Sequence, residues 1–154
     1  MVFWVFLGSA GEGWSADFDK GLNAARVGDF ATALSEWKPL AEQGDTTAQI
    51  NLGVMYEDGK GVSQDYESAV KWYRLAAEQG DVRAQINLGL MYANGAGVIQ
   101  DNVYAHMWSN IAASTGDKEA IEQRDNVAKR MNPADLSKAK DLAVECVRKK
   151  YKGC

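Results

Sequence analysis

The sequence predicts an all-α fold, a right-handed superhelical solenoid of about four antiparallel helix pairs. Three observations lead to this class. The chain repeats itself with a period of 36 residues, small and apolar residues recur at helical spacing within each repeat, and only two prolines occur in 154 residues, so long helices are permitted. A period of this length is typical of arrays in which neighbouring units stack and bury a continuous core.

The repeat is clearest between residues 44–79 and 80–115, which are identical at 19 of 36 aligned positions. The hexapeptide AQINLG at 48–53 recurs unchanged at 84–89. A Gly-Asp pair opens each of these blocks and recurs at the same interval at 116–117. Glycine suits the left-handed position that ends a helix, and the following aspartate can cap the next helix.

A first helix pair is expected over about 17–43, ahead of the clearest repeats. Gly28 joins its two helices, and one face of the second helix carries alanine, tryptophan and leucine. Pro39 lies inside that second helix, where it should kink the helix or shorten its last turn.

The two central pairs are expected over about 45–79 and 81–115. In the second helix of the pair at 45–79, apolar side chains follow the i, i+3, i+4, i+7, i+8 pattern of an amphipathic helix. A Gly-x-Gly sequence lies between the two helices of each pair and lets the chain turn with positive φ at low cost. The residues that can cap these four helices are aspartates: Asp45, Asp65, Asp81 and Asp101.

The last pair is expected over about 117–151. Its first helix is polar, and Asn132 and Pro133 then provide an N-cap and a first-turn proline for the final helix. The surface of this pair is mostly polar, as expected of a terminal cap, so residues 17–154 should form one repeat domain. The final helix should turn six residues inward: Leu136, Ala139, Leu142, Ala143, Cys146 and Val147.

Residues 1–16 are set apart from the solenoid. The apolar run 2–7 is too short to span a bilayer, and it is followed by small residues of the kind that signal peptidase accepts. No basic residue precedes the run, so we expect the remnant of a signal peptide or else a disordered apolar tail. The first alternative predicts a periplasmic or secreted protein without stable membrane insertion after processing.

The two cysteines, Cys146 and Cys154, suggest one disulfide in an exported chain. Eight residues in a helix span about 12 Å, whereas a disulfide needs Cα atoms within about 7 Å. The last helix must then end near Tyr151, with Gly153 turning the tail back. The alternative is a buried Cys146 beside a frayed, unpaired Cys154.

Composition and charge exclude several functions. A net charge of −4 argues against a nucleic-acid partner. His106 is the only histidine, so any mechanism that needs two imidazoles is excluded, and no catalytic triad is indicated around it. Two cysteines and one histidine do not make a zinc cluster, and Gly59-Lys60-Gly61 lacks the spacing of a phosphate-binding loop. We expect no enzyme, no metal site and no cofactor.

The pattern Ala-x-x-x-Leu-Gly-x-Met-Tyr-x-x-Gly-x-Gly-Val-x-x-Asp, followed by Ala-x-x-Trp, Ala-Ala and Gly-Asp, occurs at 48–81 and 84–117. It resembles the Sel-1-like repeat. The resemblance implies a tetratricopeptide-like superhelical array that serves as an adaptor scaffold. The last pair departs most from the pattern, because Leu88, Gly89 and Tyr92 are replaced there by Arg124, Asp125 and Ala128.

The resemblance also implies a partner-binding site, since tetratricopeptide-like arrays bind along a concave groove. At the matching positions of this chain, apolar residues form a row along the first helices of the pairs, and polar residues flank that row. In the last pair, Glu122 and Asn126 occupy these positions, so the apolar row would end there. The alternative is that neighbouring helices bury these side chains. The expected groove residues are Phe18, Leu22, Thr47, Ile50, Val54, Glu57, Arg83, Ile86, Leu90 and Asn94.

The predicted function is therefore an exported, monomeric scaffold that binds a protein or peptide segment in this groove. Two alternatives stay open. A few members of the resembled family are linked to cell-wall or β-lactam-like substrates, which would imply an enzyme. An accessory subunit could instead dock through its basic C-terminal helix, which carries Arg148, Lys149, Lys150 and Lys152.

Overall fold

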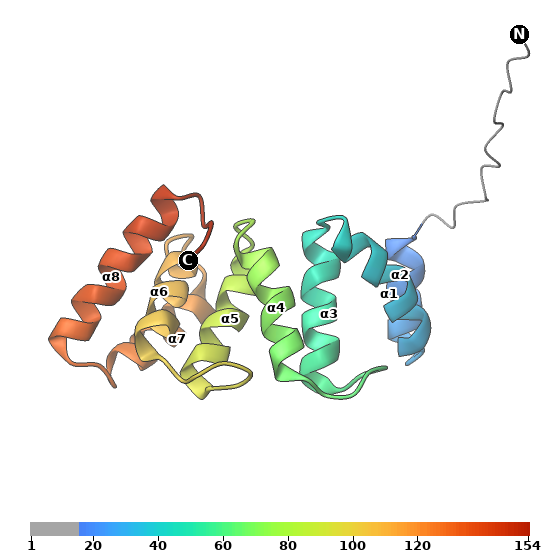
Figure 1. Ribbon diagram of the computed structural model, residues 1–154, viewed down its shortest axis with the longest axis horizontal. Helices are drawn as coiled ribbons and strands as arrows, with labels where there is room; N and C mark the ends of the chain where they lie inside the picture. The colour runs from blue at the N-terminus through green and yellow to red at the C-terminus, as the bar shows by residue number, and fades with distance from the viewer. Residues whose placement is uncertain (1–15) are drawn as a thin grey trace, which may run out of the picture.

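The computed structural model describes residues 16–154, and the regular secondary structure of this part consists of eight helices and no strand (Figure 1). The predicted all-α repeat fold is confirmed. The expected signal-peptide remnant falls almost entirely outside the described residues. The helices are α1 (Phe18–Arg26), α2 (Phe30–Glu42), α3 (Thr46–Asp58), α4 (Tyr66–Ala77), α5 (Val82–Asn94), α6 (Asn102–Ala113), α7 (Lys118–Ala128) and α8 (Pro133–Arg148).

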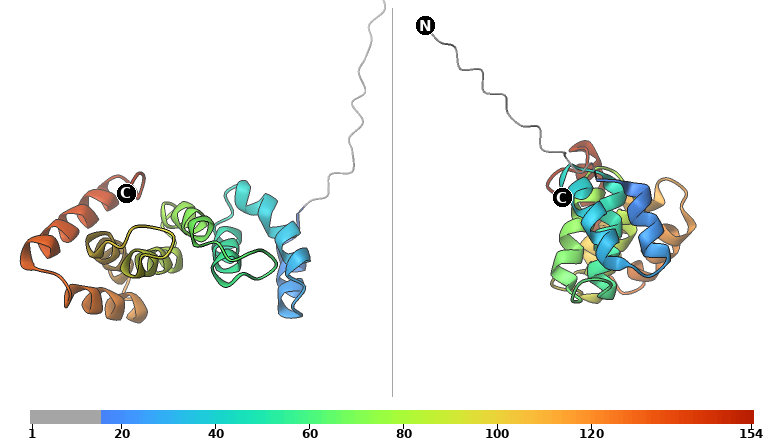
Figure 2. Two further views of the ribbon diagram at one scale, coloured as in Figure 1. Left: turned by 60° about the horizontal axis from the view of Figure 1, so that its bottom comes forward. Right: turned by 90° about the vertical axis from the view of Figure 1, so that its right-hand side faces the viewer.

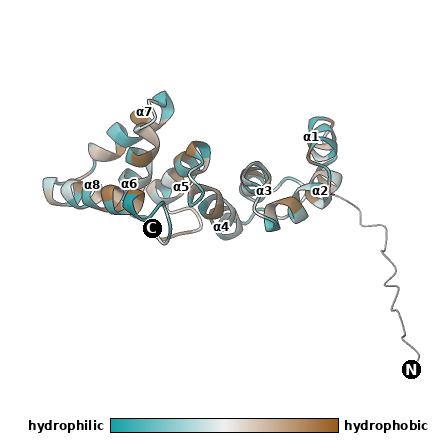
Figure 3. Cartoon of the chain, turned by 90° about the horizontal axis from the view of Figure 1, so that it is seen from above, coloured by the Kyte–Doolittle hydropathy of each residue, from teal (hydrophilic) through white to brown (hydrophobic). Residues whose placement is uncertain are grey.

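The helices stack into an elongated array in which each helix from α1 to α7 packs on its neighbours in sequence (Figure 2). Helices α1 and α2, α3 and α4, and α5 and α6 form antiparallel pairs, and α2 packs on α3 as α4 packs on α5. Seen from above, α1, α3, α5 and α7 lie along the inner side of the arc, while the even-numbered helices lie along its outer side (Figure 3). The odd-numbered helices therefore form a shared concave surface.

Six of the eight helices begin at capping residues that the sequence indicated, and Asp17 and Asp29 cap the other two. Asp45 Oδ1 accepts a hydrogen bond of 2.7 Å from the Ala48 amide at the start of α3. Helices α3 and α5 end at Gly59 and Gly95, whose φ angles of 68° and 67° are left-handed. Pro39 does not end α2, which continues to Glu42. The eight N-caps are Asp17, Asp29, Asp45, Asp65, Asp81, Asp101, Asp117 and Asn132.

The second glycine of each Gly-x-Gly loop joins one pair to the pair before it. Gly97 has a φ of 69°, and a β-carbon there would lie 2.3 Å from the carbonyl carbon and oxygen of Tyr66 at the start of α4. Gly61 lies equally close to Phe30 at the start of α2, because a β-carbon at Gly61 would come within 2.7 Å of Cβ of Phe30. These loops therefore need glycine for two reasons, backbone conformation and direct backbone contact.

The last helix departs from the regular array because α8 packs on α6 and not on α7 (Figure 2). Ala139, Ala143 and Cys146 are buried in this contact, as expected. Val147 was predicted to face inward and is 47% exposed, so that expectation is wrong. Its side chain borders a shallow recess between α6 and α8, because α8 has only one helix to pack against.

The chain after α8 turns back toward α5 and is held by the expected disulfide (Figure 1). Cys146 and Cys154 are bonded, with their Cα atoms 5.5 Å apart. The turn requires positive φ angles at Lys150 and Tyr151, which are 52° and 66°. The ring of Tyr151 lies against the turn before α5, since a β-carbon at Gly80 would come within 3.1 Å of its Cε2.

Candidate peptide-binding groove

The concave surface carries two exposed apolar side chains at equivalent positions of the two central repeats. Val54 on α3 is 36% exposed and Leu90 on α5 is 40% exposed, and they lie 36 residues apart in the chain. Both were predicted as groove residues. They belong to α3 and α5, two of the helices that lie along the inner side of the arc (Figure 3).

Ile50 and Ile86 do not line an open groove, and here the expected row of exposed residues is wrong. They are only 5% and 4% exposed. Ile86 is buried among small side chains of α6 and α7, which include Ala112 and Ala120. Ile50 lies in the main core cluster together with Tyr73 of α4. Each inner helix is covered by the neighbours that follow it, and this contact removes the isoleucine position from solvent.

Phe18 and Leu22 also belong more to the core than to an open surface. Both are partly buried and pack on a cluster formed by α1, α2 and α3. The rings of Phe18 and Trp37 are 5.9 Å apart between centroids. The apolar part of the groove therefore concentrates on α3 and α5.

The four polar groove residues lie at two levels of exposure. Thr47 and Glu57 are half-buried, whereas Arg83 and Asn94 are exposed. Glu57 is held by the hydroxyl of Tyr73, and Arg83 makes a long ion pair of 3.4 Å with Asp81.

A difference between the two central repeats shapes the groove, and sequence reasoning missed it. In the first, the ring of Tyr73 packs against Gly53, where a β-carbon would lie 2.4 Å from its Cε1. In the second, the equivalent of Tyr73 is Ser109, which donates a hydrogen bond to the carbonyl of Ala105. The missing ring leaves space beside Gly89.

Gln123 of α7 takes up this space. Its Nε2 lies 2.9 Å from where a β-carbon of Gly89 would be and donates a hydrogen bond of 3.2 Å to the carbonyl of Ile86. Its Oε1 is buried and has no hydrogen-bond donor within residues 16–154. The substitution of serine for tyrosine was visible in the aligned repeats, but the residue that would fill the space was not.

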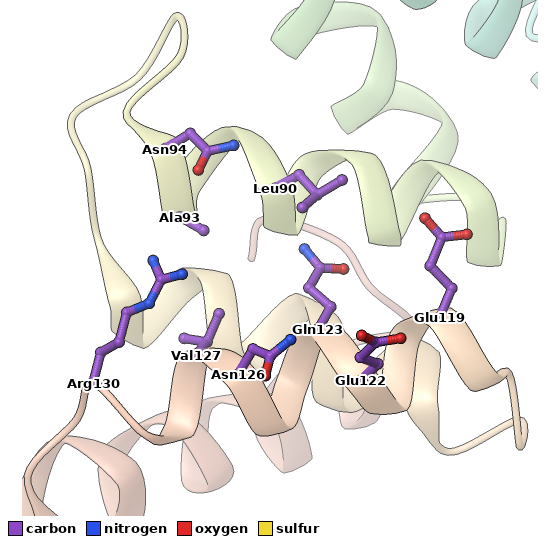
Figure 4. Close-up of a pocket in the computed structure, with 9 residues that line it drawn as sticks. All are labelled: Leu90, Ala93, Asn94, Glu119, Glu122, Gln123, Asn126, Val127 and Arg130. Carbon is purple, nitrogen blue, oxygen red and sulfur yellow. The ribbon is translucent and has the colours of Figure 1, made fainter.

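Next to Gln123, a pocket of about 240 Å³ opens between α5 and α7 (Figure 4). It has an apolar floor, two glutamates toward one end, and a guanidinium with a carboxamide toward the other. Glu122 and Asn126, which were expected to end the groove, both line it. Its lining residues are Leu90, Ala93, Asn94, Glu119, Glu122, Gln123, Asn126, Val127 and Arg130.

The single histidine lies away from this surface, inside the packing of α6. His106 is 2% exposed, and burial lowers the pKa of its imidazole, helped by the positive charges of Lys140 and Arg124. Residues 16–154 contain no group of three histidine, cysteine, aspartate or glutamate side chains that could hold a metal ion.

The basic C-terminal helix is partly neutralised by its own neighbours. Glu145 pairs with Arg148 at 2.7 Å and with Lys149 at 3.3 Å. These contacts lower the pKa of Glu145 to about 2. A docking patch built on this cluster would thus present less positive charge than the sequence implied.

Stacked helix pairs with a solvent-exposed inner face define a helical-repeat protein of the α/α solenoid class. More specifically, the chain is a Sel1-repeat protein: residues 46–81 and 82–117 each match the Sel1 repeat. The expected family is therefore confirmed. No curated protein matches the sequence of this chain.

Two solved structures are similar to it. A protective antigen present in uropathogenic Escherichia coli strains, which displays an SLR fold, is 30% identical with a TM-score of 0.80. That match covers 85% of this chain and 30% of the antigen. A Sel1 repeat protein from Oxalobacter formigenes is 31% identical with a TM-score of 0.67, over 70% of this chain and 44% of the relative. This chain thus spans less than half the length of either protein.

Proposed function

We propose that this protein is an interaction scaffold that binds a peptide or protein segment along the concave surface of α3, α5 and α7. Sel1-repeat proteins generally mediate protein–protein interactions. The observation that carries the proposal for this chain is the pair Val54 and Leu90, exposed at equivalent positions of the two central repeats, with Leu90 lining a pocket. Exposed apolar side chains that are aligned along one surface mark interaction sites, and an extended or helical segment can contact both.

The proposal places the protein outside the reducing cytoplasm. Its support is the Cys146–Cys154 disulfide, because disulfides persist mainly in oxidising compartments. The apolar run 2–7 also fits an exported chain. None of the described helices combines the length and apolar character that crossing a bilayer requires.

The test is charge insertion on the concave surface. A random peptide library is selected on the full chain, and the affinity of the enriched peptides is measured by fluorescence anisotropy. The double variant Val54→Glu with Leu90→Glu should weaken binding at least tenfold and keep the helical content. Both positions are partly exposed, so a glutamate there remains solvated.

The matched control places the same charges on apolar residues away from the groove. Val27 and Ile99 are 82% and 90% exposed in loops, so Val27→Glu with Ile99→Glu should bind as the natural chain does. Undiminished binding by the groove variant would show that the partner docks elsewhere.

A further inference from the structure

We propose that the pocket between α5 and α7 sets the specificity of the groove, and that it binds a polypeptide segment in which an apolar residue is flanked by lysine or arginine. The apolar side chain lies on Leu90, Ala93 and Val127, and the basic side chain pairs with Glu119 and Glu122. This inference rests on the proposed function, and it adds the chemistry of the partner.

The size and the floor of the pocket point to a single side chain. At about 240 Å³ the pocket is smaller than the roughly 300–1,000 Å³ of sites that enclose free small molecules. Ala93 and Val127 are 5% and 2% exposed and form a rigid base, while Leu90 remains 40% exposed above it (Figure 4). Seating an aliphatic or aromatic side chain here removes apolar surface on both partners from water.

Gln123 supplies the second, independent indication of a ligand. Its side chain lines the pocket, the residue is only 8% exposed, and its Oε1 finds no donor within the described part of the chain. The orientation of the amide is set by its own hydrogen bond to the carbonyl of Ile86. Because a buried acceptor without a partner is unfavourable, an N–H group of a bound segment would gain from reaching this oxygen.

The charges around the pocket define the flanking residue and its direction. Glu119 and Glu122 lie one turn apart on α7, both are exposed, and neither forms a salt bridge within residues 16–154. Two neighbouring carboxylates favour a cation between them. Arg130 lies at the opposite end of the pocket, where it disfavours a second cation (Figure 4). The basic residue of the segment should therefore lie toward the start of α7.

The experiment measures charge preference with the full chain. Random dodecapeptides displayed on phage are selected on it, and enriched peptides should carry an apolar residue with lysine or arginine within three positions. One enriched peptide and its copy with glutamate in place of the basic residue are then compared. The natural chain should bind the basic peptide at least tenfold more tightly.

A charge-reversal variant tests which residues cause this preference. Glu119→Lys with Glu122→Lys should invert the preference for the two peptides. The control, Glu42→Lys with Glu67→Lys, changes net charge equally on exposed residues of α2 and α4 and should keep the natural preference.

The outcomes separate this inference from the proposed function. If the charge-reversal variant keeps the natural preference while Leu90→Glu still abolishes binding, the groove is correct and the assigned chemistry is overturned. Enrichment of peptides without a basic residue overturns it equally. If Val54→Glu with Leu90→Glu has no effect, or no peptide is enriched, both the function and the inference fail.

Discussion

The hydroxyl of Tyr73 on α4 donates a hydrogen bond of 2.6 Å to Oε2 of Glu57 on α3. The tyrosine is fully buried, so its ring supports α3 from the outer side while its hydroxyl reaches a groove residue. Burial, followed by the carboxylate of Glu57, raises the pKa of Tyr73. The orientation of Glu57 therefore depends on a residue of the second helix layer.

Tyr73→Phe should lower the free energy of unfolding by about 2 kcal/mol, because it removes a hydrogen bond to a charged group and keeps the ring. Urea denaturation followed by circular dichroism measures the change. Tyr56→Phe is the control, because the hydroxyl of Tyr56 makes no hydrogen bond within the described residues. This variant should lower the free energy of unfolding much less than Tyr73→Phe. Equal losses in the two variants would contradict a specific role of the Tyr73 hydroxyl.

Gly97→Ala should destabilise the chain more than Gly116→Ala, although both glycines have positive φ angles of 69° and 85°. The left-handed conformation alone costs an alanine about 1 kcal/mol. At Gly97 the new methyl group also meets the backbone of Tyr66, whereas nothing lies within 4 Å of it at Gly116. Overpacking of this kind adds about 2 kcal/mol. Equal midpoints in urea would mean that the loop shifts freely away from α4.

His106 should make stability depend on pH below neutrality. Its pKa is lowered in the folded chain, so the unfolded chain, with a pKa near 6.5, binds the proton first as pH falls. Folded stability should therefore decrease below about pH 6.5, by at most about 1.4 kcal/mol per pH unit. His106→Val, which places the equivalent residue of the preceding repeat, Val70, at this site, should show a flatter profile between pH 7 and 5.

Loss of the disulfide should destabilise the chain by about 2–3 kcal/mol on the chain-entropy estimate for its short loop. For a chain of this length that corresponds to a melting temperature lower by about 5–10 °C. Reductant should reproduce the effect in the natural chain and have no further effect on Cys154→Ser. A natural chain that melts at the same temperature with and without reductant would contradict the prediction.

The local features of this fold were predictable because they depend on residues close together in sequence. The aspartate caps, the left-handed glycines at Gly59 and Gly95, and the turn that brings Cys154 back to Cys146 are decided by backbone geometry within a few residues. Because the sequence repeats every 36 residues, the same local structures recur in each repeat.

The groove was less predictable because it depends on contacts between repeats. Helical spacing placed Ile50 and Ile86 on the inner side, yet spacing does not show how far the next helix extends over that side. The pocket depends on Gln123 of the divergent last pair entering space beside Gly89, and no repeat period describes that contact. The packing of α8 on α6 is likewise a contact that the repeat period does not predict.

The chain after α8 turns back onto the array, so the two ends of the array differ in how they are held in place. Pairs that contact only sequential neighbours can unfold stepwise from a terminus, as expected of a one-dimensional stack. The ring of Tyr151 lies against the turn at Gly80, so the end of the chain reaches the turn that begins the third pair. Fraying of α8 must break this distant contact as well as its own packing on α6. Helices α1 and α2 are held only by the pair that follows them, through α3, the loop at Gly61 and Trp72 of α4, so opening should begin there and leave the disulfide-bonded end for last.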